Sequence, residues 1–83
     1  MRLEEMKRQG EEKLRELGLS LYEAWKCVEH LECPGGVDYG ELYEAFWMYV
    51  DAAEALEKRS IIAELERRYM EEMKERKKVA VPA

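Results

Sequence analysis

One short break, Cys33-Pro34-Gly35-Gly36-Val37-Asp38, divides this 83-residue chain into two segments that both have helical patterning. Pro34 cannot continue a helix, and the two glycines after it favour a turn. Asp38 is typical of a helix N-cap, and Glu41 stands three residues later, where the partner in a capping box belongs. The sequence therefore predicts a turn over 33–38 and a new helix from Tyr39.

The residue types on both sides of the break favour helices over strands. Apolar residues make up 47% of the chain and charged residues 40%, a combination that suits long amphipathic helices rather than disorder. Thr is absent, other β-branched residues are scarce, and no segment alternates apolar and polar residues as a strand does. The predicted fold class is therefore all-α.

The segment before the break has apolar residues at alternating spacings of three and four, which is a heptad seam like that of a coiled coil. The seam consists of Leu14, Leu17, Leu21, Ala24, Val28 and Leu31. It predicts one helix over about 3–32. Gly18 followed by Ser20, with Glu23 as a box partner, leaves open a real break and three helices in all.

The segment after the break contains neither proline nor glycine from Glu41 to Val81. It predicts one helix over about 39–78, about 60 Å long, beside a first helix of about 45 Å. Residues 79–83 are expected to be a frayed tail. We predict a single domain over 1–83, an antiparallel helical hairpin that dimerises into a helical bundle, because a chain this short buries little surface alone.

The apolar arc of the second helix is wider than the stripe of about 100° that one neighbouring helix covers. We therefore expect a second chain to cover the remainder, in a dimer or a larger assembly. The apolar positions after Ser60 lie almost opposite those before Glu57, so the helix either bends there or serves two partners. The predicted interface residues are Leu42, Tyr43, Phe46, Trp47, Val50, Ile62, Leu65, Tyr69 and Met73.

Charge is distributed unevenly along the chain. Residues 29–57 hold eight acids and no Lys or Arg, whereas residues 58–83 hold eight bases and five acids. This division favours antiparallel or offset pairing, in which opposite charges meet. The basic end offers possible anion contacts through Arg67, Arg68, Lys74, Arg76, Lys77 and Lys78.

Cys27-x-x-His30-x-x-Cys33 has the residue types of a transition-metal site. Only three ligands are present, and zinc sites usually combine two spaced pairs, so ordinary residues at a helix end are the favoured interpretation and no cofactor is predicted. The two cysteines are thiols in a reducing cytosol, but a disulfide is possible inside a hyperthermophile. The many Glu residues and the absence of Asn favour a thermophilic source.

No catalytic signature stands out, so we expect a non-enzymatic protein-interaction module that works as a homo-oligomer and binds another protein. A nucleic-acid-associated regulator that uses the basic end is the first alternative, but the net charge of −5 disfavours it. A small metal-binding protein that uses Cys27, His30 and Cys33 is the second. No run of apolar residues predicts a membrane span or a secretory signal, so the expected location is the cytoplasm.

Overall fold

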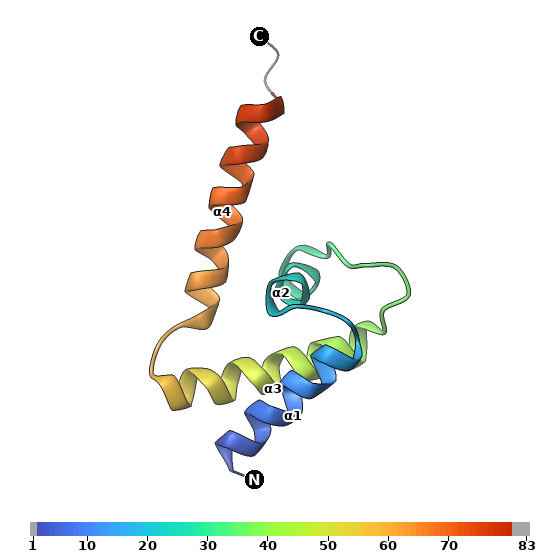
Figure 1. Cartoon of the computed structure of the whole chain (residues 1–83), viewed down its shortest axis with the longest axis vertical. Helices are drawn as coiled ribbons and strands as arrows, with labels where there is room; N and C mark the ends of the chain where they lie inside the picture. The colour runs from blue at the N-terminus through green and yellow to red at the C-terminus, as the bar shows by residue number, and fades with distance from the viewer. Residues whose placement is uncertain (1, 81–83) are drawn as a thin grey trace.

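The computed structural model describes residues 2–80, and the side chains of residues 2–76. Four helices occupy this part of the chain: α1 (Leu3–Glu16), α2 (Leu21–His30), α3 (Tyr39–Glu57) and α4 (Ile61–Ala80). Helices α1 and α3 lie against each other, α2 crosses near them, and α4 leaves the end of α3 at an angle (Figure 1), with part of its length in contact with α2. Of the helices described, none is long and apolar enough to cross a bilayer.

The first helix ends where the sequence allowed a break. Gly18 adopts a positive φ of 73°, and the amide of Leu19 donates to the carbonyl of Leu14 at 3.0 Å, which closes a Schellman-type turn. Ser20 then caps α2, and its side chain and that of Glu23 form a complete capping box. The expected single helix over 3–32 is therefore wrong, and the heptad seam is not one continuous stripe.

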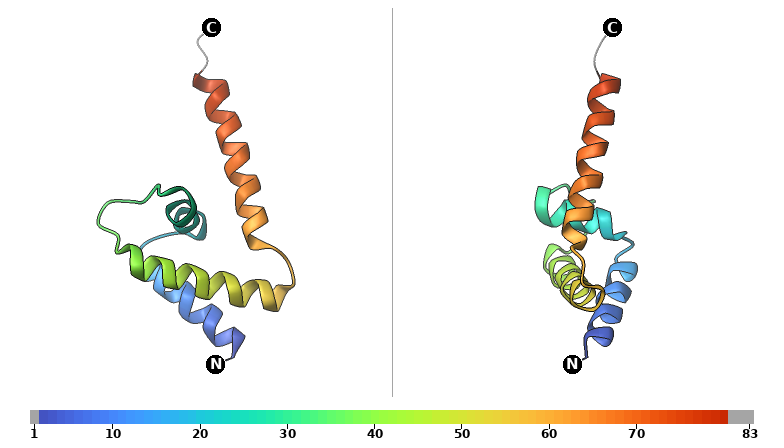
Figure 2. Two further views of the ribbon diagram at one scale, coloured as in Figure 1. Left: turned by 180° about the vertical axis from the view of Figure 1, so that it is seen from behind. Right: turned by 90° about the vertical axis from the view of Figure 1, so that its left-hand side faces the viewer.

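The second helix also divides, between Glu57 and Ile61. Lys58 adopts the left-handed conformation, with φ 52° and ψ 45°, and turns the chain so that α4 leaves α3 at an angle (Figure 2). The expected uninterrupted helix over 39–78 is wrong. Residues 79 and 80 continue α4 rather than belonging to a tail, and residues 81–83 lie outside the described residues.

Helices α1 and α3 run antiparallel and make the closest contact in the fold. Lys7 near the start of α1 pairs with Glu57 at the end of α3 at 3.1 Å, and Lys13 near the end of α1 lies 3.6 Å from Glu41 at the start of α3. A hairpin-like pair therefore exists, but α2 separates its two members in the sequence. It is not the predicted pair of two long helices.

Gly10 sets how near the two helices approach. A Cβ at this position would stand 2.7 Å from the backbone nitrogen of Tyr49 and 2.8 Å from the carbonyl oxygen of Ala45. Only a residue without a side chain lets the α1 backbone come this close to α3. The contact brings α1 onto one side of the wide apolar arc of α3.

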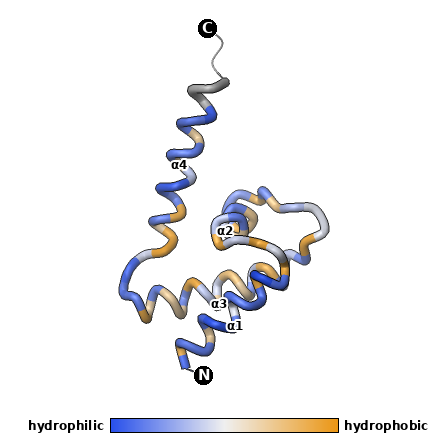
Figure 3. Tube along the Cα trace, viewed as in Figure 1, coloured by the Kyte–Doolittle hydropathy of each residue, from blue (hydrophilic) through white to orange (hydrophobic). Residues whose placement is uncertain are grey.

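The core lies between α1, α2 and α3, with the first turns of α4 at its edge. Its largest fully buried side chains are Trp25, Phe46, Leu42, Val50 and Cys27. Along α4, apolar residues recur between hydrophilic ones (Figure 3), and the most buried of them are Ile61 and Leu65. Burial in α4 is therefore concentrated near the bend.

Candidate protein-binding surface

The predicted interface residues separate into two groups in the structure. Leu42, Phe46 and Val50 are completely buried in the core of their own chain, and Leu65 is 7% exposed. Because the chain breaks after α1, it supplies α3 with two neighbouring helices instead of one. These neighbours cover the centre of the arc, which leaves those residues no area for a second chain in this fold.

The exposed edge of the arc is aromatic. Tyr39 and Tyr43 are 42% and 46% exposed, and Trp47 is half-buried one turn further along α3. Their rings follow one another at centroid distances of 5.9 Å and 6.4 Å. We refer to Tyr39, Tyr43 and Trp47 as the aromatic strip. Aromatic residues of this kind combine a large apolar area with few rotatable bonds, so they anchor many protein interfaces.

The aromatic strip contacts the buried core through Trp47. The Trp47 ring packs edge-on against the buried ring of Phe46, with centroids 5.1 Å apart. The indole nitrogen of Trp47 is buried and has no hydrogen-bond partner among the described residues. Packing against Phe46 therefore positions the Trp47 ring beside Tyr43.

Exposed acidic side chains lie beside the strip on the same helix. Glu44 and Asp51 are exposed on α3, and the segment 29–57 contains no lysine or arginine of its own. Glu41 is also exposed, and Lys13 approaches its carboxylate at 3.6 Å. Of the predicted capping box only one half is present: the Asp38 side chain caps α3 by accepting from the Glu41 amide at 3.2 Å. The electrostatic potential here favours a basic partner.

A second aromatic cluster joins α4 to α2. The Tyr69 ring of α4 stacks on His30 at 4.2 Å and packs edge-on against Trp25 at 5.5 Å. Its hydroxyl donates to Glu32 at 2.7 Å, and this hydrogen bond raises the pKa of Tyr69. Ile62 and Tyr69 pack against the core of their own chain, and Met73 is half-buried one turn further along α4.

Tyr22 completes this junction from the α2 side. Burial, together with the hydrogen bond that its hydroxyl donates to Glu72, raises the pKa of Tyr22 to about 12. The same hydrogen bond lowers the pKa of Glu72. Arg68 lies over the Tyr22 ring, 4.1 Å from its centroid. The junction therefore consists mainly of side-chain contacts between aromatic and charged groups.

The candidate metal ligands have other partners. Cys27 and Cys33 form a disulfide, so neither sulfur is a free thiolate that binds a metal. His30 is occupied in the stack with Tyr69. Over the described residues, His, Cys, Asp and Glu side chains nowhere assemble into a group of three suited to a metal ion. The disulfide instead ties the loop after α2 to the helix.

The candidate anion contacts are also partly engaged. Arg68 covers Tyr22, and Arg76 pairs with Glu72 at 3.4 Å, whereas Arg67 and Lys74 are exposed on α4. The side chains of Lys77 and Lys78 lie outside the described residues. A nucleic-acid contact along α4 stays a prediction. The ion pair of Arg76 and the cation–π contact of Arg68 do not favour it.

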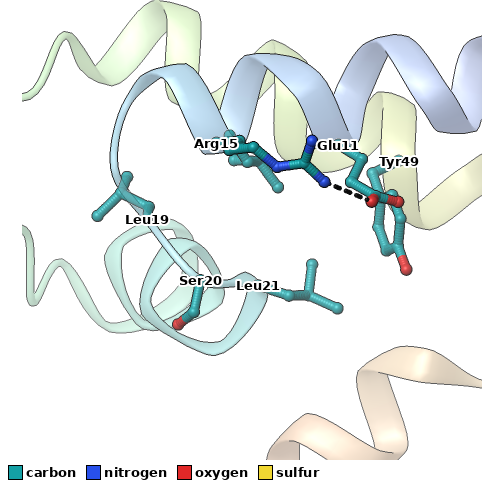
Figure 4. A pocket seen from close by; sticks show the side chains of 7 residues that line it. Glu11, Arg15, Leu19, Ser20, Leu21 and Tyr49 are labelled. Atoms are coloured by element: carbon teal, nitrogen blue, oxygen red, sulfur yellow. Dashed lines mark hydrogen bonds and ion pairs between the residues drawn. The ribbon is translucent and has the colours of Figure 1, made fainter.

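A cavity of about 250 Å³ lies beside the turn between α1 and α2 (Figure 4). Glu11 and Arg15 form an ion pair at 3.1 Å along one edge. The cavity is smaller than the ligand sites of about 300–1,000 Å³ that proteins usually form, and its two charged residues, Glu11 and Arg15, pair with each other. Its lining residues are Glu11, Leu14, Arg15, Leu19, Ser20, Leu21 and Tyr49.

Two features of the surface were missed by sequence reasoning. Tyr39 extends the aromatic strip, and its spacing of four residues from Tyr43 was a visible signal. Leu31 is 76% exposed in a left-handed conformation after α2, although the heptad pattern placed it in a seam. The pattern misled because it continued past the residue at which the helix ends.

Comparison of the chain with known protein families, with curated protein sequences and with solved structures found no match.

Proposed function

We propose that this chain is a non-enzymatic protein-interaction module that works as a homo-oligomer and binds a basic helical segment of another protein. The observation that carries the proposal is the aromatic strip: Tyr39, Tyr43 and Trp47 on successive turns of α3, partly exposed and backed by the core. A helix that lays apolar side chains on consecutive turns matches the spacing of the strip. Basic residues beside those side chains match the surrounding acids.

The roles of the shifted titratable groups support a non-enzymatic function. Glu23 has a lowered pKa because it completes a helix cap, and Glu57 has one because Arg59 and Lys7 bind it. The shifts at Tyr22, Tyr69 and Glu72 belong to the junction between α2 and α4. Perturbed pKa values often mark catalytic groups, but each of these has a structural cause.

A synthetic amphipathic peptide of leucine and lysine tests the strip directly. We expect it to bind in a calorimetric titration and to bind more weakly as salt is added, because salt screens the acids around the strip. A matched peptide of leucine and glutamate is expected to bind at least about tenfold more weakly, since like charges repel.

Two variants locate the binding. Tyr43→Ala removes the most exposed ring of the strip and is expected to weaken the leucine–lysine peptide by about tenfold, the effect of a moderate hot spot. Met70→Ala is the control, because Met70 is an equally apolar residue that is 63% exposed on α4. If both variants bind as the natural chain does, or if the acidic peptide binds as tightly, the strip is not the partner site.

The expected cytoplasmic location and thermophilic source belong to the same proposal. The disulfide between Cys27 and Cys33 agrees with the interior of a hyperthermophile and equally with an oxidising compartment. Thiol labelling of the chain purified from its native source distinguishes reduced from oxidised protein. A reduced pair in the native source would favour an ordinary reducing cytosol.

A further inference from the structure

Apart from Ser60, which caps the start of α4, the local sequence does not favour the bend between α3 and α4. The residues at the bend are Lys58, Arg59 and Ser60, and no glycine or proline occurs from Glu41 to Ala80. Lys58 nevertheless has a positive φ of 52°, a conformation that is costly for a residue with a side chain. The local preference is for a helix that continues through the bend, and the closed form opposes that preference.

The backbone amides that are hydrogen-bonded at the bend would also be hydrogen-bonded in a straight helix. The Glu54 carboxylate accepts from the amides of Ile61 at 2.9 Å and Ile62 at 3.3 Å. The Ser60 hydroxyl accepts from the amide of Ala63 at 3.1 Å. In a continuous helix these three amides donate to the carbonyls four residues earlier. Straightening therefore replaces each of these three hydrogen bonds with a helical one and relieves the conformation of Lys58.

What opposes straightening is the junction between α4 and α2. A straight helix carries the inner face of α4 away from Trp25, Tyr22 and Glu32 of its own chain. The residues after the bend lie almost opposite those before it on a continuous helix, so α1 and α2 of the same chain are unable to cover both stripes. Only α2 of a second chain restores the contacts of Tyr69 and Glu72.

We infer that two copies of this chain exchange α4. In the exchanged dimer, residues 39–80 form one helix of about 63 Å. Each α4 packs its inner face on α2 of the partner, with the contacts that it makes within one chain here. The exchange is reciprocal, so the dimer closes, and a short strained hinge is the setting in which such exchange occurs. This inference rests on the self-association in the proposed function and not on the aromatic strip.

Two variants at one residue test the hinge by sedimentation. Lys58→Gly favours the bend, because glycine accepts a positive φ and weakens a continuous helix. It is expected to raise the dimer dissociation constant by about a hundredfold, since each dimer contains two hinges. Lys58→Ala removes the same side chain but favours the straight helix, so its dimer is expected to be at least as tight as the natural one. Equal dissociation constants for the two variants would overturn the exchange, as would a chain that stays monomeric at millimolar concentration.

The arrangement of α4 is tested by nuclear magnetic resonance on a mixture of isotope-labelled and unlabelled chains. In the exchanged dimer the rings of Trp25 and Tyr69, 5.5 Å apart, belong to different chains and give an intermolecular Overhauser contact. The rings of Phe46 and Trp47, both on α3, provide the control and stay intramolecular. A dimer without the Trp25–Tyr69 contact would contradict the exchange. Because Tyr43→Ala leaves the hinge untouched, it is expected to weaken peptide binding by about tenfold without changing the dimer. The variant therefore separates failure of this inference from failure of the strip.

Discussion

The contact between α1 and α3 and the contact between α4 and α2 hold helices together in different ways. At the first, Gly10 lets two backbones meet, and the side chains beneath, such as Phe46, are completely buried. At the second, α4 touches α2 through the tips of long side chains, including Tyr69 with His30 and Tyr22 with Glu72. In a closely packed contact, a change at one residue shifts its neighbours. A contact between the ends of side chains can open with less loss of buried area.

This difference implies an order of opening. The three-helix part, residues 3–57, contains nearly all of the fully buried apolar residues and is expected to unfold as one cooperative unit. Helix α4 is expected to separate from it at a lower free energy, with its inner face briefly exposed. We expect that opening to be the step from which the proposed exchange between two copies begins.

The largest expected effect is at the centre of the packed part. Phe46→Ala removes a completely buried ring and is expected to lower the free energy of unfolding by about 4 kcal/mol. Urea unfolding followed by circular dichroism measures it. Tyr43→Ala on the same helix is the control, expected within about 0.5 kcal/mol of the natural chain because Tyr43 is partly exposed. Equal effects of the two variants would mean that α3 is not buried as described.

A single methyl group tests the close contact of α1 with α3. Gly10→Ala improves the helix propensity of α1, yet its Cβ meets the α3 backbone at less than 3 Å. We expect a net loss of about 2 kcal/mol, because overpacking forces the two backbones apart. Gly40→Ala is the matched control, since its Cβ finds only the Asp38 side chain at 3.4 Å. A stabilised Gly10→Ala variant would show that the helices are further apart.

Alkaline pH tests the contact of α4 with α2. The pKa of Tyr22 is about 12 in the folded chain, whereas an unfolded chain has the ordinary tyrosine pKa near 10. Folding therefore favours the protonated form, and this contribution to stability, on the order of 1 kcal/mol, is present below pH 10 and is lost as pH rises through 12. Tyr22→Phe is expected to lose this part of the pH dependence. The test compares the two chains by urea unfolding at pH 9 and pH 11, and parallel declines would contradict the junction.

The smallest expected effect is local to the start of α4. Glu54→Ala removes the carboxylate that accepts from the amides of Ile61 and Ile62. We expect faster hydrogen exchange at these two amides, with a change in global stability below about 1 kcal/mol, because loss of a cap acts on one helix end. Glu44→Ala, at an exposed acid of the same helix, is the control. Unchanged exchange at Ile61 would show that Glu54 does not hold this end of α4.

Much of the candidate site was predictable, and the missing part has one cause. The spacing of the apolar residues predicts the wide arc of α3, and Tyr43 and Trp47 are among the predicted interface residues. Leu42 and Phe46 were assigned to a second chain because the number of neighbouring helices within one chain was not known. The role of Gly10 was not predictable for a related reason. The close approach that requires a glycine within α1 is evident only once the position of α3 is known.

Local chemistry determined where the helices begin and, in the first segment, where they end. Ser20 and Asp38 cap α2 and α3 through amides three residues away, and Gly18 accepts the conformation that ends α1. Each of these interactions lies within one helical turn, so the sequence by itself specifies it. The bend at Lys58 is different, because nothing in its neighbourhood requires a left-handed residue. Only the tertiary structure decided it: the apolar stripe after the bend needs α2, and burying that stripe outweighs the cost of one strained residue.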